Sequence, residues 1–191
     1  GYVVDFTAAD AWSIPELPTL AQISPNPTDY RVEFDFASAF TGSRLGDVTA
    51  PVTPVDLQLF PGNTSTSGCE PADFAGFPAG TIALLQRGAC AFGLKAQNAL
   101  NAGAVAVLIG NQGDTEDRKA PASGTFGDPV DIVGVPISYD VMVELSQTPG
   151  VVVRVDTDTT DSSSLLGPQA LPTIDWHIAE ELLPLRGAID A

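Results

Sequence analysis

Residues 80–110 decide the fold, and they read GTIALLQRGACAFGLKAQNALNAGAVAVLIG. Residues 81–86 and 104–109 are short, nearly continuous apolar runs, which are typical of strands buried on both faces. Between them, residues 92–102 predict a helix whose apolar positions share one face: Phe92, Ala96, Ala99 and Leu100. Gly103 stands where a left-handed C-cap would end that helix. The stretch therefore predicts a right-handed strand–helix–strand unit with parallel strands.

Upstream, residues 30–36 alternate apolar and polar positions, which predicts a strand with one buried face. Two further strands are expected at 46–52 and 55–60. Pro51 and Pro54 would confine parts of them to sheet edges or bulges.

Downstream, residues 111–128 are polar and contain glycine, so we expect a loop. A strand follows at 130–137. Ser138 can then cap a helix over 139–147 because its hydroxyl accepts from free backbone N–H groups. A β-branched strand at 151–155 ends the ordered pattern.

The chain divides into three expected parts. Residues 1–29 form a proline-rich arm, with one helical turn at 17–23. Residues 30–156 form the domain. Residues 157–191 form a linker and tail, in which 173–183 have helical spacing.

Composition excludes several partners. The 191 residues carry a net charge of −16, which repels nucleic acid and anionic membranes. No apolar run approaches the roughly 20 residues that cross a bilayer, so we expect no membrane insertion. No signal peptide is visible at the start of the sequence.

The two cysteines, Cys69 and Cys90, cannot build a four-thiolate zinc site. They form either a disulfide that closes a loop of about 22 residues, which requires an oxidising compartment, or a pair of buried free thiols.

The sequence offers no expected catalytic residue, metal ligand or cofactor motif. His177 is the single histidine, and it cannot by itself supply a zinc or Ser–His–Asp site. Carboxylate pairs are numerous, but acids are expected on an acidic surface. Residues 156–161 hold acids that could bind calcium, although they lack the spacing of an EF-hand, and a solvated linker is the alternative.

A longer pattern runs through the deciding stretch and beyond it. It comprises Cys69-Glu70, the run GTIAL at 80–84, QRGACAF at 86–92, KAQNA at 95–99 and AGA at 102–104. Asn111 and the run VPISY at 135–139 continue it. The series resembles the protease-associated (PA) domain family, and residues 46–57 resemble the version inserted in secreted zinc aminopeptidases.

This resemblance implies an α/β (α+β) fold: β-sandwich or open-barrel-like sheets flanked by short helices. It also implies a Cys69–Cys90 disulfide. Gly88 would permit a tight turn, and Arg87 would be an ion-pair partner near the helix start. In the related plant vacuolar sorting receptors the equivalent loop takes part in cargo binding. The candidate ligand-contact residues are Arg87, Gly88, Ala89, Cys90 and Phe92.

The resemblance further implies a non-catalytic, secreted domain that assists a peptidase. Its partners would be a peptide or protein substrate, or a catalytic peptidase domain. The alternative is a free-standing binding module for peptides or glycans. A third hypothesis is that the chain is a small enzyme. Asn63 begins an N-glycosylation acceptor pattern, which also arises often by chance.

Overall fold

A computed structural model describes residues 17–59 and 64–158. The elements, in chain order, are β1 (Thr19–Ser24), β2 (Thr28–Asp29), β3 (Thr41–Ser43), β4 (Asp47–Pro54), η1 (Pro71–Phe74), β5 (Ile82–Gln86), α1 (Phe92–Asn101), β6 (Ala106–Gly110), η2 (Glu116–Arg118), β7 (Thr125–Val130), β8 (Val133–Ile137), α2 (Tyr139–Gln147) and β9 (Val152–Asp156). Seven strands form one sheet in the order β2-β1-β9-β4-β5-β6-β8, and β3 pairs with β7 in a second, two-stranded sheet.

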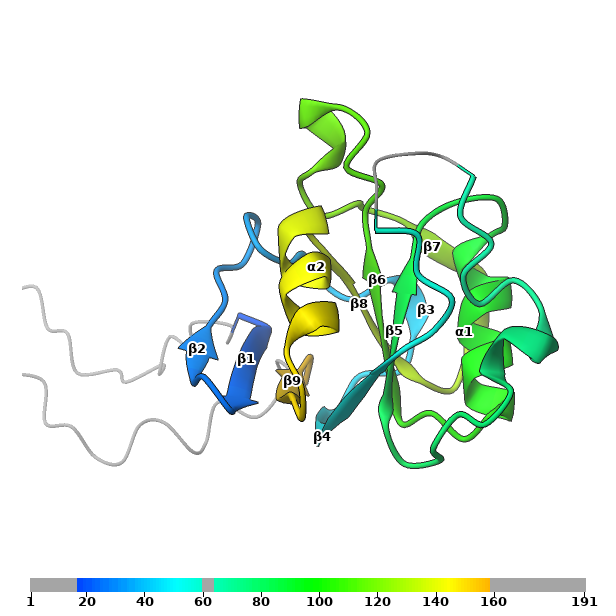
Figure 1. The fold of residues 1–191 in the computed structure, drawn as a ribbon, viewed down its shortest axis with the longest axis horizontal. Helices are drawn as coiled ribbons and strands as arrows, with labels where there is room; N and C mark the ends of the chain where they lie inside the picture. Colours follow the sequence, from blue (N-terminus) through cyan, green and yellow to red (C-terminus); the bar gives the residue numbers. More distant parts are fainter. Residues whose placement is uncertain (1–16, 60–63, 159–191) are drawn as a thin grey trace, which may run out of the picture. The chain divides into compact units, whose positions relative to one another are not determined.

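The strands β4, β5, β6 and β8 are parallel, which confirms the expected strand–helix–strand unit. Figure 1 shows α1 and α2 on opposite sides of these strands. Side chains of β5 alternate between the two sides: Ile82 and Leu84 belong to the cluster that includes α2, whereas Ala83 and Leu85 belong to the cluster that includes α1. The strand is apolar throughout because both of its faces are covered.

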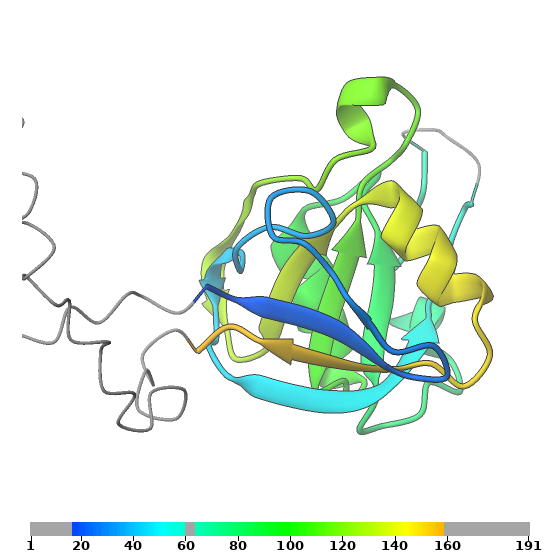
Figure 2. The same cartoon turned by 90° about the vertical axis from the view of Figure 1, so that its left-hand side faces the viewer.

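The other half of the sheet is antiparallel. Strand β9 lies between β1 and β4, and the three strands run side by side in Figure 2. Strand β4 changes partner along its length: Asp47–Pro51 pair with β9, whereas Val52–Pro54 pair with β5. One strand therefore joins the antiparallel and parallel halves, which agrees with the expected α/β (α+β) fold in which short helices flank the sheets.

Local signals predicted the ends of both helices correctly. Gly103 follows α1 with φ of +88°, the conformation of a glycine C-cap. At the start of α2, the Val141 N–H donates to the Ser138 hydroxyl at 3.2 Å.

The prediction of a strand at 30–36 was wrong. These residues form a turn in which Glu33 has φ of +69°. The Asp35 carboxylate accepts from the Arg31 backbone N–H at 2.9 Å and from its guanidinium at 3.1 Å, so a local side-chain bond replaces strand pairing. Phe36 is buried, but Phe34 is 66% exposed beneath the Arg31 guanidinium.

Three further expectations need correction. Residues 19–24 form strand β1, where a helical turn was expected, because they add to the free edge of β9. Strand β4 ends at Pro54, and residues 55–59 form no strand. The strand expected at 130–137 is present as β8 but begins at Val133, because Val130 is the last residue of β7, which pairs with β3.

The region 111–128, expected as a loop, contains η2 and most of β7. The expected tail helix at 173–183 and the glycosylation pattern at Asn63 lie outside the described residues.

Candidate functional site

The carboxyl ends of β4, β5 and β6 lead into three connections at one end of the parallel strands, at the top of Figure 1. These connections are the segment 64–69, the turn 87–91 and the loop 111–124. Ligands of open parallel sheets commonly bind outside the carboxyl ends of the strands. We call this region the loop surface.

A disulfide joins two of these connections. Cys69 and Cys90 are bonded, with their Cα atoms 5.8 Å apart, which confirms the expected pairing. Gly88 lies beneath Ser65: a Cβ atom on Gly88 would stand 2.0 Å from the Ser65 carbonyl oxygen. The Ala89 N–H donates to that same oxygen at 2.9 Å. Close backbone approach therefore requires glycine here, rather than the positive φ of a tight turn.

Arg87 is held by neutral partners. Its backbone N–H donates to the Gly110 carbonyl at 2.8 Å, and its guanidinium donates to Asn111 Oδ1 at 3.2 Å. Among the described residues no carboxylate forms a salt bridge with it, so the expected ion pair near the helix start is replaced by an amide hydrogen bond. A guanidinium has five N–H donors, and this bond uses one of them.

Two side chains of α1 donate hydrogen bonds to backbone carbonyls of the segment 64–69. Lys95 is fully buried, and its ammonium donates to the Ser67 carbonyl and lies 3.5 Å from Cys69 Sγ. Asn98, one helical turn later, donates from Nδ2 to the Gly68 carbonyl at 3.1 Å. Burial lowers the pKa of Lys95 to about 8, because the charged form has lost its water.

The loop 111–124 is tied to β6 and α2. Asn111 Nδ2 donates to the Ala120 carbonyl at 2.7 Å, and the Tyr139 N–H donates to the Lys119 carbonyl at 2.9 Å. The Tyr139 hydroxyl donates to the Leu59 carbonyl. Burial raises the pKa of this phenol, with a smaller contribution from Asp140.

The structure brings four of the five candidate contact residues to the loop surface. Ala89 is exposed, and Arg87, Gly88 and Cys90 are half-buried. Phe92 differs because its ring packs on Phe40, with centroids 4.9 Å apart, beside the core under α1. That these residues contact a ligand stays a prediction.

Sequence reasoning did not assign support roles to Lys95, Asn98 and Tyr139. The first two could have been found, because their i, i+3 spacing places both on one helix face. The bond of Tyr139 to Leu59 has no such signal, since it spans 80 residues.

A family model of the PA domain matches residues 48–145, which is about half of the chain. The chain belongs to the PA domain family. It is 49% identical over 151 residues to an aminopeptidase that is found in two strains of Pseudomonas aeruginosa. The alignment covers 74% of this chain and 28% of the relative, so the PA domain chain spans well under half of that enzyme.

Two solved structures are similar to this PA domain. A zinc aminopeptidase from Bacillus subtilis is 25% identical with a TM-score of 0.54, over 73% of this chain and 30% of that one. An aminopeptidase from Aneurinibacillus sp. strain AM-1 is 29% identical with the same TM-score, over 74% and 30%. No helix in the described part of the chain is both long and apolar enough to cross a membrane.

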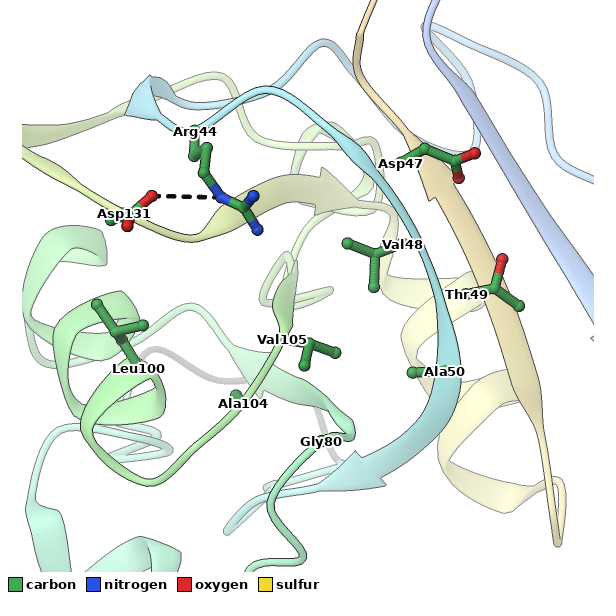
Figure 3. Close-up of a pocket in the computed structure, with 10 residues that line it drawn as sticks. All are labelled: Arg44, Asp47, Val48, Thr49, Ala50, Gly80, Leu100, Ala104, Val105 and Asp131. Atoms are coloured by element: carbon green, nitrogen blue, oxygen red, sulfur yellow. Dashed lines mark ion pairs between the residues drawn. The ribbon is translucent and has the colours of Figure 1, made fainter.

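The PA domain also has a concave surface, at the opposite end of the parallel strands from the loop surface (Figure 3). It is an open groove of about 510 Å³ between the first half of β4 and the residues that precede β6. Val48, Ala50 and Val105 line its apolar part. Arg44 and Asp131 form an ion pair of 3.3 Å at its rim. No sequence signal indicated this groove, because its walls come from segments far apart in the chain.

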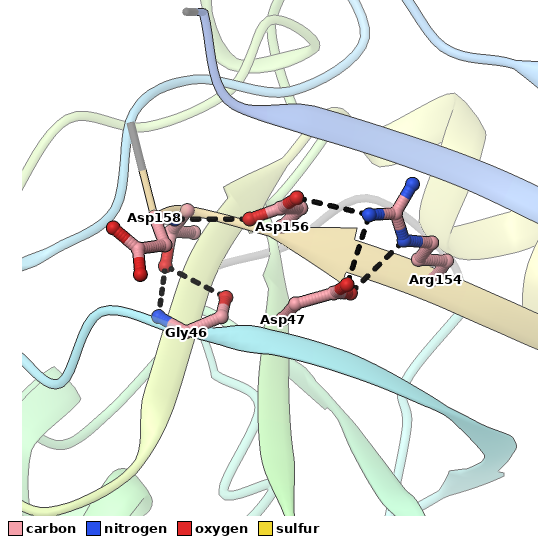
Figure 4. A network of polar contacts seen from close by, with 6 residues as sticks. Gly46, Asp47, Arg154, Asp156 and Asp158 are labelled. Atoms are coloured by element: carbon pink, nitrogen blue, oxygen red, sulfur yellow. Dashed lines mark hydrogen bonds and ion pairs between the residues drawn. The ribbon is translucent and has the colours of Figure 1, made fainter. Parts of the chain in front are cut away.

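Beside this groove, Arg154 binds both the groove residue Asp47 and the acidic end of β9 (Figure 4). Arg154 donates to both carboxylate oxygens of Asp47, at 3.0 and 2.8 Å, and to Asp156 at 3.0 Å. Asp156 belongs to the segment 156–161 in which calcium binding was considered. Within residues 17–59 and 64–158, no group of three or more acids, cysteines or histidines could hold a metal ion. Calcium binding at 156–161, of which residues 159–161 lie outside the described residues, stays a prediction.

Proposed function

We propose that this PA domain is a non-catalytic part of a secreted aminopeptidase, and that its loop surface engages peptide substrate or the catalytic domain. One observation carries the proposal. An identity of 49% extends over most of this chain but over 28% of the aminopeptidase from P. aeruginosa. The shared part is thus a fraction of a larger enzyme, and an accessory role is the function that best fits such a fraction.

The chemistry of the loop surface supports a binding role. Arg87 is half-buried, and Asn111 occupies one of its donors. The remaining N–H groups suit a peptide carbonyl or a carboxylate, which guanidinium groups bind well. The disulfide and the bonds from Lys95 and Asn98 hold the neighbouring backbone in place, which lowers the entropy lost on binding.

Secretion is part of the proposal. A disulfide is stable in oxidising compartments and is rare in the bacterial cytosol. The bond between Cys69 and Cys90 supports an extracytoplasmic location for the enzyme.

The test uses the full-length parent enzyme with Arg87→Ala. We expect kcat/KM for a peptide of about eight residues to fall roughly fivefold, which corresponds to about 1 kcal/mol, a typical net hydrogen bond. A single aminoacyl chromogenic amide offers no extended peptide for the loop surface to bind, and its kcat/KM should not change.

Arg31→Ala is the matched control, since Arg31 is an exposed arginine that pairs with Asp35 in the turn at residues 30–36. Equal losses for the long and short substrates would indicate a structural defect. Unchanged kinetics for both would remove Arg87 from the proposed surface.

A further inference from the structure

We propose that the first half of β4 is a docking edge at which an extended peptide segment of another protein adds as a strand. This inference does not depend on the loop surface, which lies at the other end of the parallel strands. It rests on the direction of the β4 peptide groups, the walls of the groove and the net charge of the chain.

The hydrogen bonds of β4 show which peptide groups are free. The Val52 N–H donates to the Val151 carbonyl and the Thr157 N–H donates to the Gly46 carbonyl, both at 3.0 Å, so even-numbered residues face β9. Backbone groups alternate in direction along a strand. The backbone N–H and C=O groups of Asp47 and Thr49 therefore point away from β9. Strand β5 pairs only with Val52–Pro54, so no described strand lies beside those two residues.

The groove lies against this free edge. Four consecutive residues of β4, from Asp47 to Ala50, line it. A strand turns alternate side chains to opposite faces, so four successive residues border one groove only when the edge of the strand faces it. Figure 3 shows this edge on one side of the groove and Val105 on the other.

An extended main chain is the ligand that complements such an edge, because its N–H and C=O groups pair with those of the free strand. Its inward side chains would meet Val48, Ala50 and Val105, which favours small apolar residues such as valine. Its ends would lie near Asp47 and Asp131, which already pair with Arg154 at 2.8 Å and with Arg44 at 3.3 Å. The preference for basic ends therefore rests on the net charge of the whole chain, −16, and not on unpaired carboxylates at the rim.

The probe is the blocked peptide acetyl-Lys-Val-Thr-Val-Lys-amide, titrated into the ¹⁵N-labelled protein. We expect a dissociation constant below about 1 mM, with amide shifts centred on residues 47–50. Hydrogen exchange at the Thr49 amide should slow at least tenfold at saturation, whereas the Ala50 amide, which already faces β9, should not change. The peptide with glutamate in place of lysine should bind at least fivefold more weakly.

Thr49→Pro removes the free N–H without breaking a bond to β9, and we expect it to abolish binding. Thr49→Val keeps that N–H and should retain binding. If the proline variant does not fold, the same peptide methylated at its central nitrogen replaces it and should not bind. The proposal is overturned by shifts confined to residues 87–91, by no shift at 47–50 up to about 2 mM peptide, or by protection of Thr49 through self-association without peptide.

Discussion

The two ends of the parallel strands differ in how many bonds hold their backbone in place. At the carboxyl ends, a disulfide, Lys95, Asn98 and Asn111 tie the connections together. At the amino ends, β4 separates from β5 and leaves a groove whose rim has two exposed ion pairs, Arg44–Asp131 and Arg154–Asp47. Exposed ion pairs contribute little to stability. One end thus presents a fixed surface of side chains, and the other presents an open main chain.

This difference indicates two modes of recognition in one small domain. A fixed surface discriminates partners through the groups it positions, as Arg87 would do. An open strand edge binds main chain, so it accepts many sequences and selects weakly, through the side chains that enter its groove.

Removing the disulfide should affect stability most. The double substitution C69S/C90S opens a loop of about 22 residues, and we expect the free energy of unfolding to fall by about 3 kcal/mol. The melting temperature should fall by about 10 °C. Urea and thermal unfolding measure both quantities. Binding of the valine-containing peptide at the β4 groove should persist at temperatures where the variant is folded, and its loss would show that the two ends are coupled.

Alanine at two glycines compares the ends directly. Gly88→Ala places a Cβ atom 2.0 Å from a backbone oxygen and should cost about 3 kcal/mol. Gly80→Ala at the groove meets no atom within 4 Å, but φ there is +84°, so it should cost about 1 kcal/mol. Denaturation of both variants measures the difference. Equal costs would contradict the view that the carboxyl ends are the tightly packed ones.

The ammonium of Lys95 should make stability depend on pH. Its pKa is about 8 in the folded state, below the usual 10.5, so unfolding takes up a proton between those values. The free energy of unfolding should therefore rise as pH increases from 8 to 9.5, by about 1 kcal/mol relative to Lys95→Met. Well below pH 8 the amine is charged in both the folded and the unfolded state, so the free energy of unfolding no longer depends on its titration.

Lys119→Met is the matched control for this titration. Lys119 is at the surface, and Glu116 raises its pKa, so its contribution is not gained between pH 8 and 9.5. Parallel pH profiles for the wild type and Lys95→Met would show that the amine is hydrated in the folded protein.

Local signals explain which parts of the fold could be predicted. Strand β5, helix α1 and the Ser138 cap are encoded by neighbouring residues, and the sequence predicted them correctly. Residues 30–36 carry the same alternation as a strand, yet the bond between Asp35 and Arg31 closes them into a turn. Periodicity cannot separate these outcomes, because it reports which side chains are apolar and not what the backbone pairs with.

The candidate site divides in the same way. The Cys69–Cys90 pair and Arg87 were predictable because they belong to a spaced family pattern. The groove was not, since it depends on where β5 begins relative to β4, a long-range register that no local motif records.

The pairing of β1 with β9 has a consequence for the architecture of larger proteins. Thr19 lies opposite Asp156, so the polypeptide enters and leaves the domain on adjacent antiparallel strands, about 5 Å apart. A unit whose entrance and exit are neighbours can be spliced into a surface loop of another protein without separating the two halves of that loop. The same geometry makes it a portable cassette for fusion and circular permutation.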